Sequence, residues 1–438
     1  MRYGRRRRLT IGIASICVAL AVVFVAGPVM GQTPNPPAPA VIGSETFHQR
    51  RLALLDSLKD GLAVLCSQGE MTADGYRAVG NFWYLTGRDE PGAILVLQPG
   101  TPEDEILLLR PRDPESEQWT GERPALTESL QVAWSFDRIR RVDRLDGIVL
   151  ARMKQSPRLH LISSLVRTSD PIPPDLEMYS QVAARIPGTE ITNSSRFVER
   201  MRMIKSDAEI AAIEKAIALT HQGITDELAA VHPGTTELAL DGVLEESLKR
   251  RGVEHLAFEP IIGTGPDAAI VHYGKRERVL AAGDLLLIDC GAEWDHYCSD
   301  ITRTVPVDGF FTPEQAALYD IVLAAQTAAI AAVRPGVTLR QIDSTARAVI
   351  RQSGYVDQMI HFTAHHLGLE VHDAADEALP LAPGMVIAVE PGIYLPDRKI
   401  GVRIEDDVLV TPEGNRVLSA AIPRERAAVE SWLAAVRK

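Results

Sequence analysis

The sequence predicts an α/β fold built as two domains, the second of which contains an internal repeat. Three observations carry this prediction. The chain has 438 residues, which exceeds the size at which a single hydrophobic core keeps growing. Its first half alternates short apolar runs with helical stretches, and its second half repeats several motifs at an offset of about 100 residues. The apolar and charged fractions, 46% and 24%, are those of an ordinary globular protein.

The first residues, 1–31, have the pattern of a signal peptide or membrane anchor. A basic run from Arg5 to Arg8 precedes an uncharged apolar stretch over residues 9–26. A signal peptide would be cleaved before Gln32, but the stretch is also nearly long enough to stay in a bilayer. With either outcome we expect an exported protein, periplasmic or secreted, that touches a membrane only if the leader is retained.

The first domain is expected over residues 45–203, after a linker at 32–44. Proline and small residues without a periodic apolar pattern predict an extended tether for the linker. A helical pattern from Phe47 to Lys59 then opens the domain. It is followed by apolar runs bounded by turn residues, namely LAVLCS, GAILVLQ, EILLLR and LHLISS. Short strands that alternate with helices indicate an α/β domain.

The second domain is expected over residues 204–438. Ser206 and Glu209 have the spacing of a capping box ahead of a helix with apolar residues at helical intervals. The run Thr312–Gln315 marks another helix start, with proline at the first helical position, where a missing N–H costs nothing.

This second domain repeats itself. AAVHPG returns as AAVRPG, a Val-His pair returns, and GDLLLIDCG returns as GMVIAVEPG. The matched segments are 229–234 and 331–336, 271–272 and 371–372, and 283–291 and 384–392. Several matches in one order at nearly one offset predict two equivalent halves folded face to face, in which Asp289 matches Glu390.

The charge of the chain excludes one class of partner. The formal net charge is −12, and the arginines of the leader are opposed by no acid there, so the remainder is more acidic still. A strongly acidic body argues against binding of nucleic acid.

The cysteines do not make a disulfide framework. Without the leader the chain keeps Cys66, Cys290 and Cys298, an odd number. A bridge between Cys290 and Cys298 is conceivable in an oxidising compartment, but a hairpin between them would place the two on opposite faces. We therefore expect these thiols to be small buried apolar groups.

Four acids and one histidine are the candidate metal ligands. Apolar runs lead into Asp289 and Glu390, and a buried carboxylate is costly unless it is paired or bound to a metal. A turn and a second strand follow each run and bring another acid, Asp300 or Glu405. If Asp289 and Asp300 face each other across a hairpin, their side chains emerge on the same face. His365, in HFTAHHLGLEVHD, is the natural fifth ligand.

Taken singly, each of these residues could be an ordinary turn acid or core histidine. Their matching places in two halves call for a common explanation. Four carboxylates offset the charge of two divalent cations, and an oxygen-rich set with one imidazole suits manganese or cobalt better than thiolate-preferring zinc. We therefore expect two divalent ions as cofactors, Mn²⁺ first, with Co²⁺ or Zn²⁺ as alternatives. Such a pair activates water near neutral pH without a strong base.

At this point the sequence resembles the pita-bread metallopeptidases, in the aminopeptidase P and prolidase branch. The motifs that carry the resemblance are IDCGAEWDHYCSDITRTVPV, HFTAHHLGLEVHD, VEPGIY and GVRIEDD, together with NFWYLTG and RDPESEQWTGER in the first domain. The resemblance implies a creatinase-like α/β first domain and a pita-bread second domain with a pseudo-twofold repeat. It also implies a homo-oligomer, either a dimer or a tetramer.

The resemblance further assigns roles to residues. Asp300 and Glu405 would bridge both metals, with His365 and Glu390 completing one and Asp289 the other. The substrate-binding residues would be His272, His361, His372 and Arg403, the last of these beside the bridging Glu405. Glu390 would shuttle a proton, and His361 and His372 would stabilise the developing oxyanion.

The implied activity is hydrolysis of the bond between an N-terminal residue and a following proline. The substrates would be peptides with proline at the second position. Within enzymes the alternatives are a prolidase, a general aminopeptidase or a creatinase-type amidinohydrolase, and outside them a catalytically silent binding protein of the same fold. Two departures concern the pocket: HFTA replaces a glycine-rich stretch, and the segment between Tyr394 and Gly401 is short.

Overall fold

The computed structural model describes residues 42–72, 75–164, 171–376 and 378–437. The predicted leader and nearly all of the linker at 32–44 lie outside these residues. The domain limits expected near residues 45 and 203 stay predictions.

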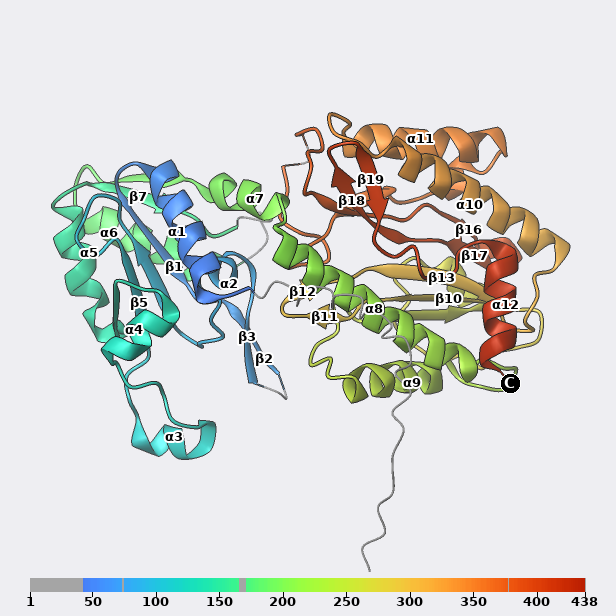
Figure 1. The fold of residues 1–438 in the computed structure, drawn as a ribbon, viewed down its shortest axis with the longest axis horizontal. Coiled ribbons are helices and arrows are strands. Elements are labelled where there is room, and N and C mark those ends of the chain that lie inside the picture. Colours follow the sequence, from blue (N-terminus) through green and yellow to red (C-terminus); the bar gives the residue numbers. More distant parts are fainter. Residues whose placement is uncertain (1–41, 73–74, 165–170, 377, 438) are drawn as a thin grey trace, which may run out of the picture. The chain divides into compact units, whose positions relative to one another are not determined.

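A six-stranded mixed sheet organises the first part of the described chain (Figure 1). Its order is β6-β5-β4-β1-β7-β8, and all four predicted apolar runs lie in it as strands. The strands are β1 (Leu62–Cys66), β4 (Ile94–Leu97), β5 (Glu105–Leu109), β6 (Arg138–Arg141), β7 (Arg158–Leu161) and β8 (Glu190–Asn193). Leu62 and Val64 pack into one core, whereas Ala63 and Leu65 pack into another, because successive side chains of a strand point to opposite faces. Both faces of the sheet are therefore covered, as an α/β domain requires.

Helices supply that cover. The first is α1 (Ser44–Leu58), close to the predicted helix. The other helices of this part are α2 (Gly80–Thr86), α4 (Glu128–Trp134), α5 (Leu145–Met153), α6 (Pro174–Arg185), α7 (Ser195–Met203) and α3 (Pro114–Thr120), of which α3 projects away from the sheet (Figure 1). A 3₁₀ turn η1 (Val142–Arg144) and a hairpin of β2 (Gly69–Thr72) and β3 (Gly75–Ala78) complete this part.

The second part consists of two halves with the same succession of elements. The first half has α8 (Asp207–Ala229), α9 (Glu237–Arg250), β9 (Ile261–Thr264), β10 (Leu285–Cys290) and β13 (Ile301–Pro306). The second half has α10 (Pro313–Ala332), α11 (Leu339–Gln352), β14 (Ala364–His366), β15 (Val386–Val389) and β18 (Asp406–Thr411), extended by β19 (Gly414–Val417). In the first half β10 pairs with β9 and β13, and in the second half β15 pairs with β14 and β18. The predicted internal repeat is confirmed.

Equivalent hydrogen bonds repeat as well. Gly234 N–H donates to Leu280 O over 2.9 Å, and Gly336 N–H donates to Leu381 O over 2.8 Å. Shorter elements complete this part. They are η2 (Gly265–Ala269), β11 (Glu293–Trp294), β12 (Tyr297–Cys298), η3 (Val356–Gln358), β16 (Gly392–Leu395), η4 (Pro396–Arg398), β17 (Ile400–Arg403) and α12 (Arg426–Val436).

Both predicted helix starts are confirmed. Ser206 and Glu209 form a reciprocal capping box at the start of α8, and Thr312 and Gln315 form another at α10, where proline follows the cap. Each box satisfies two backbone N–H groups at the helix start that have no partner within the helix. Helix α10 is long and apolar enough to cross a bilayer, but its apolar side chains, such as Val322 and Ala329, are buried in the core.

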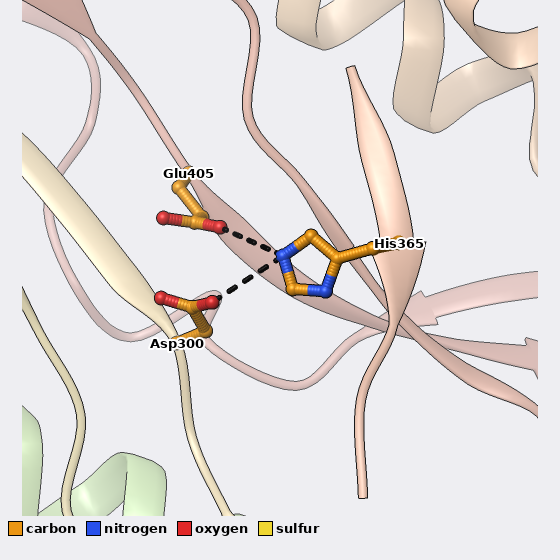
Figure 2. A group of neighbouring side chains, drawn as sticks. All are labelled: Asp300, His365 and Glu405. Carbon is orange, nitrogen blue, oxygen red and sulfur yellow. Dashed lines mark ion pairs between the residues drawn. The ribbon is translucent and has the colours of Figure 1, made fainter. Parts of the chain in front are cut away.

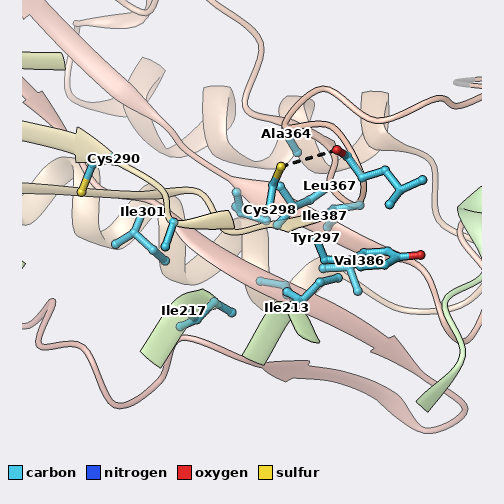
Figure 3. Close-up of a cluster of buried hydrophobic side chains, with 14 of the residues drawn as sticks. Ile213, Ile217, Cys290, Tyr297, Cys298, Ile301, Ala364, Leu367, Val386 and Ile387 are labelled. Atoms are coloured by element: carbon cyan, nitrogen blue, oxygen red, sulfur yellow. Dashed lines mark hydrogen bonds between the residues drawn. The ribbon is translucent and has the colours of Figure 1, made fainter. Parts of the chain in front are cut away.

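The three described cysteines are free thiols, as expected. Figure 3 shows Cys290 and Cys298 among buried apolar side chains such as Ile301 and Val386. The Cys298 thiol lies 3.6 Å from Leu369 O. Burial raises the pKa of both thiols well above the usual value, which keeps them protonated and inert.

Candidate metal centre

Two acids come from the first half. Asp289 lies in β10 opposite Thr302, and Asp300 directly precedes β13. The expected pairing of Asp289 with Asp300 is therefore wrong by two residues, because the connecting hairpin turns at Asp295 and His296 and β11 and β12 keep the register of β10 and β13. Residues two apart share a face of a strand, and directly opposed residues share one too. Asp289, Thr302 and Asp300 thus still point to the same side.

The second half brings two acids and the histidine to one face. His365 of β14 lies opposite Ala388 of β15. Glu390 follows two residues later, so it shares the face of Ala388 and His365. Asp406 lies opposite Val389, which places Glu405 beside Glu390 on that face. Three strands in register therefore deliver three of the predicted ligands together.

The two halves differ at one equivalent place. Gly263 lies opposite Leu287 in the first half, just as His365 lies opposite Ala388 in the second. A Cβ atom at Gly263 would lie 2.9 Å from the backbone of Asp267 in η2. The first half therefore has no room for a counterpart of His365.

The side chains from both halves converge on the His365 ring (Figure 2). Its Nε2 lies 3.4 Å from Asp300 Oδ2, 3.7 Å from Glu390 Oε1 and 4.0 Å from Glu405 Oε1. Asp300, His365 and Glu405 offer ligand atoms that all lie within 4.8 Å of one another. The His365 Nδ1 lies 3.1 Å from His366 O. An Nδ1–H that donates to this carbonyl leaves Nε2 free to accept a proton or a metal.

Arg403 connects the remaining acid to the group. Its guanidinium is buried, forms an ion pair with Asp289, and donates to Thr302 Oγ1 over 3.1 Å and to Tyr394 Oη over 2.8 Å. The Thr302 hydroxyl in turn donates to Glu405 Oε2 over 2.7 Å. Asp289 and Glu405 are thus held through the same guanidinium.

The electrostatics of this cluster call for cations. Burial, followed by repulsion from neighbouring carboxylates, raises the pKa of Asp300 and of Glu405 well above the usual values. Burial likewise raises the pKa of Glu390 to about 7. Asp289 Oδ1 and Glu405 Oε1 are buried and accept no hydrogen bond from the described part of the chain. Four acids faced by one guanidinium, with oxygens left without a donor, fit divalent metal ions.

All nine residues predicted for the site line one cavity of about 1530 Å³. They are His272, Asp289, Asp300, His361, His365, His372, Glu390, Arg403 and Glu405. His372 packs edge-on against His365, with ring centroids 4.3 Å apart. Burial lowers the pKa of His361 and of His372 to about 4, so both rings are neutral at physiological pH.

His361 has partners on both ring nitrogens. Its Nε2 lies 2.8 Å from Tyr394 Oη and its Nδ1 lies 2.9 Å from Phe362 O. Because Arg403 already donates to that phenol oxygen, the Tyr394 hydroxyl is free to donate to Nε2. His372 differs, since the described residues offer its ring no hydrogen bond.

Two family models match the chain. The aminopeptidase P N-terminal domain matches residues 47–161, and metallopeptidase family M24 matches residues 211–412. An Xaa-Pro aminopeptidase of Escherichia coli is 33% identical over an alignment that covers 91% of this chain and 99% of that protein. The chain belongs to metallopeptidase family M24.

Solved structures place it in the aminopeptidase P branch of M24. E. coli aminopeptidase P with the inhibitor Pro-Leu superposes with a TM-score of 0.81 at 29% identity, covering 91% of this chain and all of that one. An aminopeptidase of Pseudomonas aeruginosa gives a TM-score of 0.81 at 30% identity, covering 91% and 99%. The predicted creatinase-like domain followed by a pita-bread domain is confirmed, and this M24 chain is a metallo-aminopeptidase.

Sequence reasoning missed the hydroxyl groups of this M24 site. Tyr394 bridges His361 and Arg403, and Thr302 bridges Arg403 and Glu405. Both residues stood inside the motifs VEPGIY and SDITRT, but nothing in their spacing marked them. The individual roles of the nine site residues stay predictions, as does the dimer or tetramer.

Proposed function

We propose that this chain is an Xaa-Pro aminopeptidase that works with two divalent cations, Mn²⁺ in preference to Co²⁺ or Zn²⁺. The observation that carries the proposal is the ligand set: four carboxylates and one imidazole from two facing halves, in one cavity, with two buried oxygens left without a donor. Hard carboxylate oxygens suit manganese, and the absence of a thiolate from the cavity lining disfavours a zinc-selective site.

In this proposal Asp300 and Glu405 would help to hold both ions, His365 and Glu390 would complete the ligands of one, and Asp289 would complete those of the other. The contacts support the division. His365 lies within 3.4 to 4.0 Å of Asp300, Glu390 and Glu405, whereas Asp289 is turned to Arg403. Bound metal ions supply Lewis-acid activation of a water molecule and of the substrate carbonyl.

Proton transfer and stabilisation of the transition state then fall to Glu390 and to the histidines around the ligands. Glu390 Oε2 lies 3.6 Å from His361 Nδ1, so this carboxylate is placed to take a proton from the attacking water and to deliver it to the leaving amine. His372 has a free ring nitrogen on the cavity wall, and its neutral imidazole can donate to the oxyanion that develops in the transition state. His361 can do so only if Tyr394 or Phe362 gives up its bond.

The preference for proline at the second position rests on the relatives. The E. coli relative is named an Xaa-Pro aminopeptidase, and its solved structure holds the inhibitor Pro-Leu. That dipeptide begins with proline, like the product left when one residue ahead of proline is removed. A cavity of about 1530 Å³ exceeds the roughly 300–1000 Å³ that encloses a drug-sized ligand, which leaves room for a chain beyond the proline.

A prolidase is the second candidate, and one observation favours it. A dipeptidase needs a cation to hold the free carboxylate of its substrate. The Arg403 guanidinium is occupied by protein groups, but Arg340, near the start of α11, lines the same cavity and is exposed. Its guanidinium could serve as that cation.

Matched peptides separate the two candidates. With manganese-loaded protein we expect Xaa-Pro-Yaa to have a kcat/KM at least about tenfold above that of Xaa-Pro, because the cavity has room for the longer chain. Steady-state kinetics of both peptides measures the ratio. A dipeptide that is strongly preferred, with longer peptides refused, would establish the prolidase and leave the metal site unchanged.

We also propose that the protein works outside the cytoplasm. The support is the basic run Arg5–Arg8 followed by an uncharged apolar stretch and a proline-rich segment. Cell fractionation should find the activity in the periplasm, the medium or the membrane fraction. Recovery of soluble cytoplasmic protein with Met1 intact would contradict this.

A further inference from the structure

The segment that carries His372 has no strand of its own. β14 ends at His366, and residues 367–376 are irregular. Glu370, His372 and Asp373 of this segment line the cavity beside the candidate ligands. Because the described residues offer the His372 ring no hydrogen bond, its position depends on how its neighbours in the chain are held.

Asp373, the next residue, is held by two buried cations. Arg202 Nη2 donates to Asp373 Oδ1 over 2.5 Å, and Lys205 Nζ donates to Asp373 Oδ2 over 3.0 Å. All three side chains are 1% exposed. Both carboxylate oxygens are thus fixed, and the Asp373 N–H donates to His366 O over 3.0 Å. A Cβ at Gly368 would lie 2.2 Å from Asp373 Oδ2, so glycine lets the segment close tightly on this carboxylate.

Arg202 also contacts the part of the chain that contains the six-stranded sheet, which we call the first sheet region. Its Nη1 donates to Asn81 Oδ1 over 2.9 Å, and Asn81 Nδ2 donates to Ile162 O, which follows β7, over 2.7 Å. Its Nη2 lies 3.5 Å from Glu370 Oε1. One guanidinium at the end of α7 therefore joins the start of α2 to the segment that carries His372.

Stability alone does not explain such a cluster. A buried ion pair often contributes no more to the free energy of unfolding than apolar side chains of the same volume do, since the cost of desolvation offsets most of the attraction. Here two cations are buried around one carboxylate, with a partly exposed Glu370 as the other nearby acid. What the arrangement does provide is a fixed geometry, because a guanidinium fork and an ammonium together restrain both oxygens.

We propose that Arg202 and Lys205 are positioning residues that fix His372 through Asp373, and that Asn81 ties this restraint to the first sheet region. The inference rests on the proposed peptidase function of the same cavity. The roles of Arg202 and Lys205 are to hold a substrate-facing imidazole in place; they touch neither substrate nor metal.

The test uses the full chain loaded with manganese and a tripeptide Xaa-Pro-Yaa. We expect Arg202→Met and Lys205→Met each to lower kcat by about 10- to 100-fold, since a misplaced group costs transition-state contacts, with KM changed less and metal content unchanged. A double-mutant cycle gives the decisive readout. In a His372→Ala background the added loss from Arg202→Met should vanish, because the residue through which Arg202 acts is gone.

Arg50→Met is the matched control. Arg50 is also buried, pairs with Glu209 over 3.0 Å and joins α1 to α8, but it does not line the cavity. Both arginine variants should lower the Tm, yet only Arg202→Met should lower kcat by tenfold or more. Equal losses of kcat in the two variants, or additive losses in the cycle, would overturn the proposal.

Hydrogen–deuterium exchange separates this inference from the proposed function. Arg202→Met should speed amide exchange in residues 367–376 well beyond the change that Arg50→Met causes there, even if the wild-type chain does not cleave Xaa-Pro-Yaa. Unchanged exchange in that segment would overturn the inference independently of activity. If Arg202→Met does not fold, Arg202→Lys and Asp373→Asn take its place, with the same outcomes deciding.

Discussion

Glu405→Ala is expected to empty the metal centre and to lower the activity by about 1000-fold or more, the upper end of what one preorganised charge contributes. Glu405 is buried, and Thr302 donates to its Oε2, while its Oε1 accepts no hydrogen bond from the residues that the structure describes. A shared ligand serves both ions, so its loss should reduce the metal content from about two ions per chain to less than one. Elemental analysis of the purified variant, alongside tripeptide hydrolysis, measures both effects.

Asp289→Ala is the comparison that tests the assignment. In the proposed assignment Asp289 would complete one position only, so this variant should keep about one ion and lose less metal than Glu405→Ala. Equal metal retention in the two variants would contradict the roles assigned to Asp289 and Glu405.

For the wild type, chelation should abolish activity and Mn²⁺ should restore it. Activity that survives chelation, in protein shown to contain no metal, would contradict the proposed dinuclear centre.

Glu390→Gln is the second substitution with a large expected effect. It keeps the shape of the side chain and an oxygen ligand but removes the group that we propose carries the proton, so kcat should fall by roughly 10²- to 10⁴-fold. KM should change much less. Single-turnover hydrolysis of the tripeptide separates this loss of chemistry from a change in product release.

Glu227→Gln is its control. Glu227 on α8 is also a fully buried glutamate, but it lies outside the cavity lining. The same isosteric change there should leave kcat within about threefold, the usual context-dependent spread of a single contact. A loss as large as that of Glu390→Gln would show that both variants act by general disruption, and the proton-carrying role would have no support.

The parts of the site that the sequence predicts are those marked by charge and repetition. Asp289 and Glu390 end apolar runs at equivalent places, and a carboxylate at the end of a buried strand is costly enough to need a reason. His365 stands in a histidine-rich segment. The apolar runs, the repeated motifs and the histidines are visible in the sequence itself, so they can be read before the fold is known.

The remaining features depend on contacts that no local pattern records. Thr302 and Tyr394 are neutral and common, and only the fold shows that their hydroxyls connect Arg403 to the ligands and to His361. Arg202 and Asp373 lie 171 residues apart. The two-residue offset between Asp289 and Asp300 follows from the position of the hairpin turn at Asp295 and His296, which sets the register and which strand alternation alone does not determine.

Gly263 in β9 gives the two equivalent halves of the second part different sets of donor atoms. Because Gly263 leaves no space for an imidazole, the first half supplies only carboxylates and the second half supplies the single nitrogen donor. In the proposed assignment the two metal positions would therefore have different donor atoms, and the position without nitrogen would compete with the Arg403 guanidinium for Asp289. The ions should accordingly load in sequence, with unequal dissociation constants, and the site near His365 should fill first.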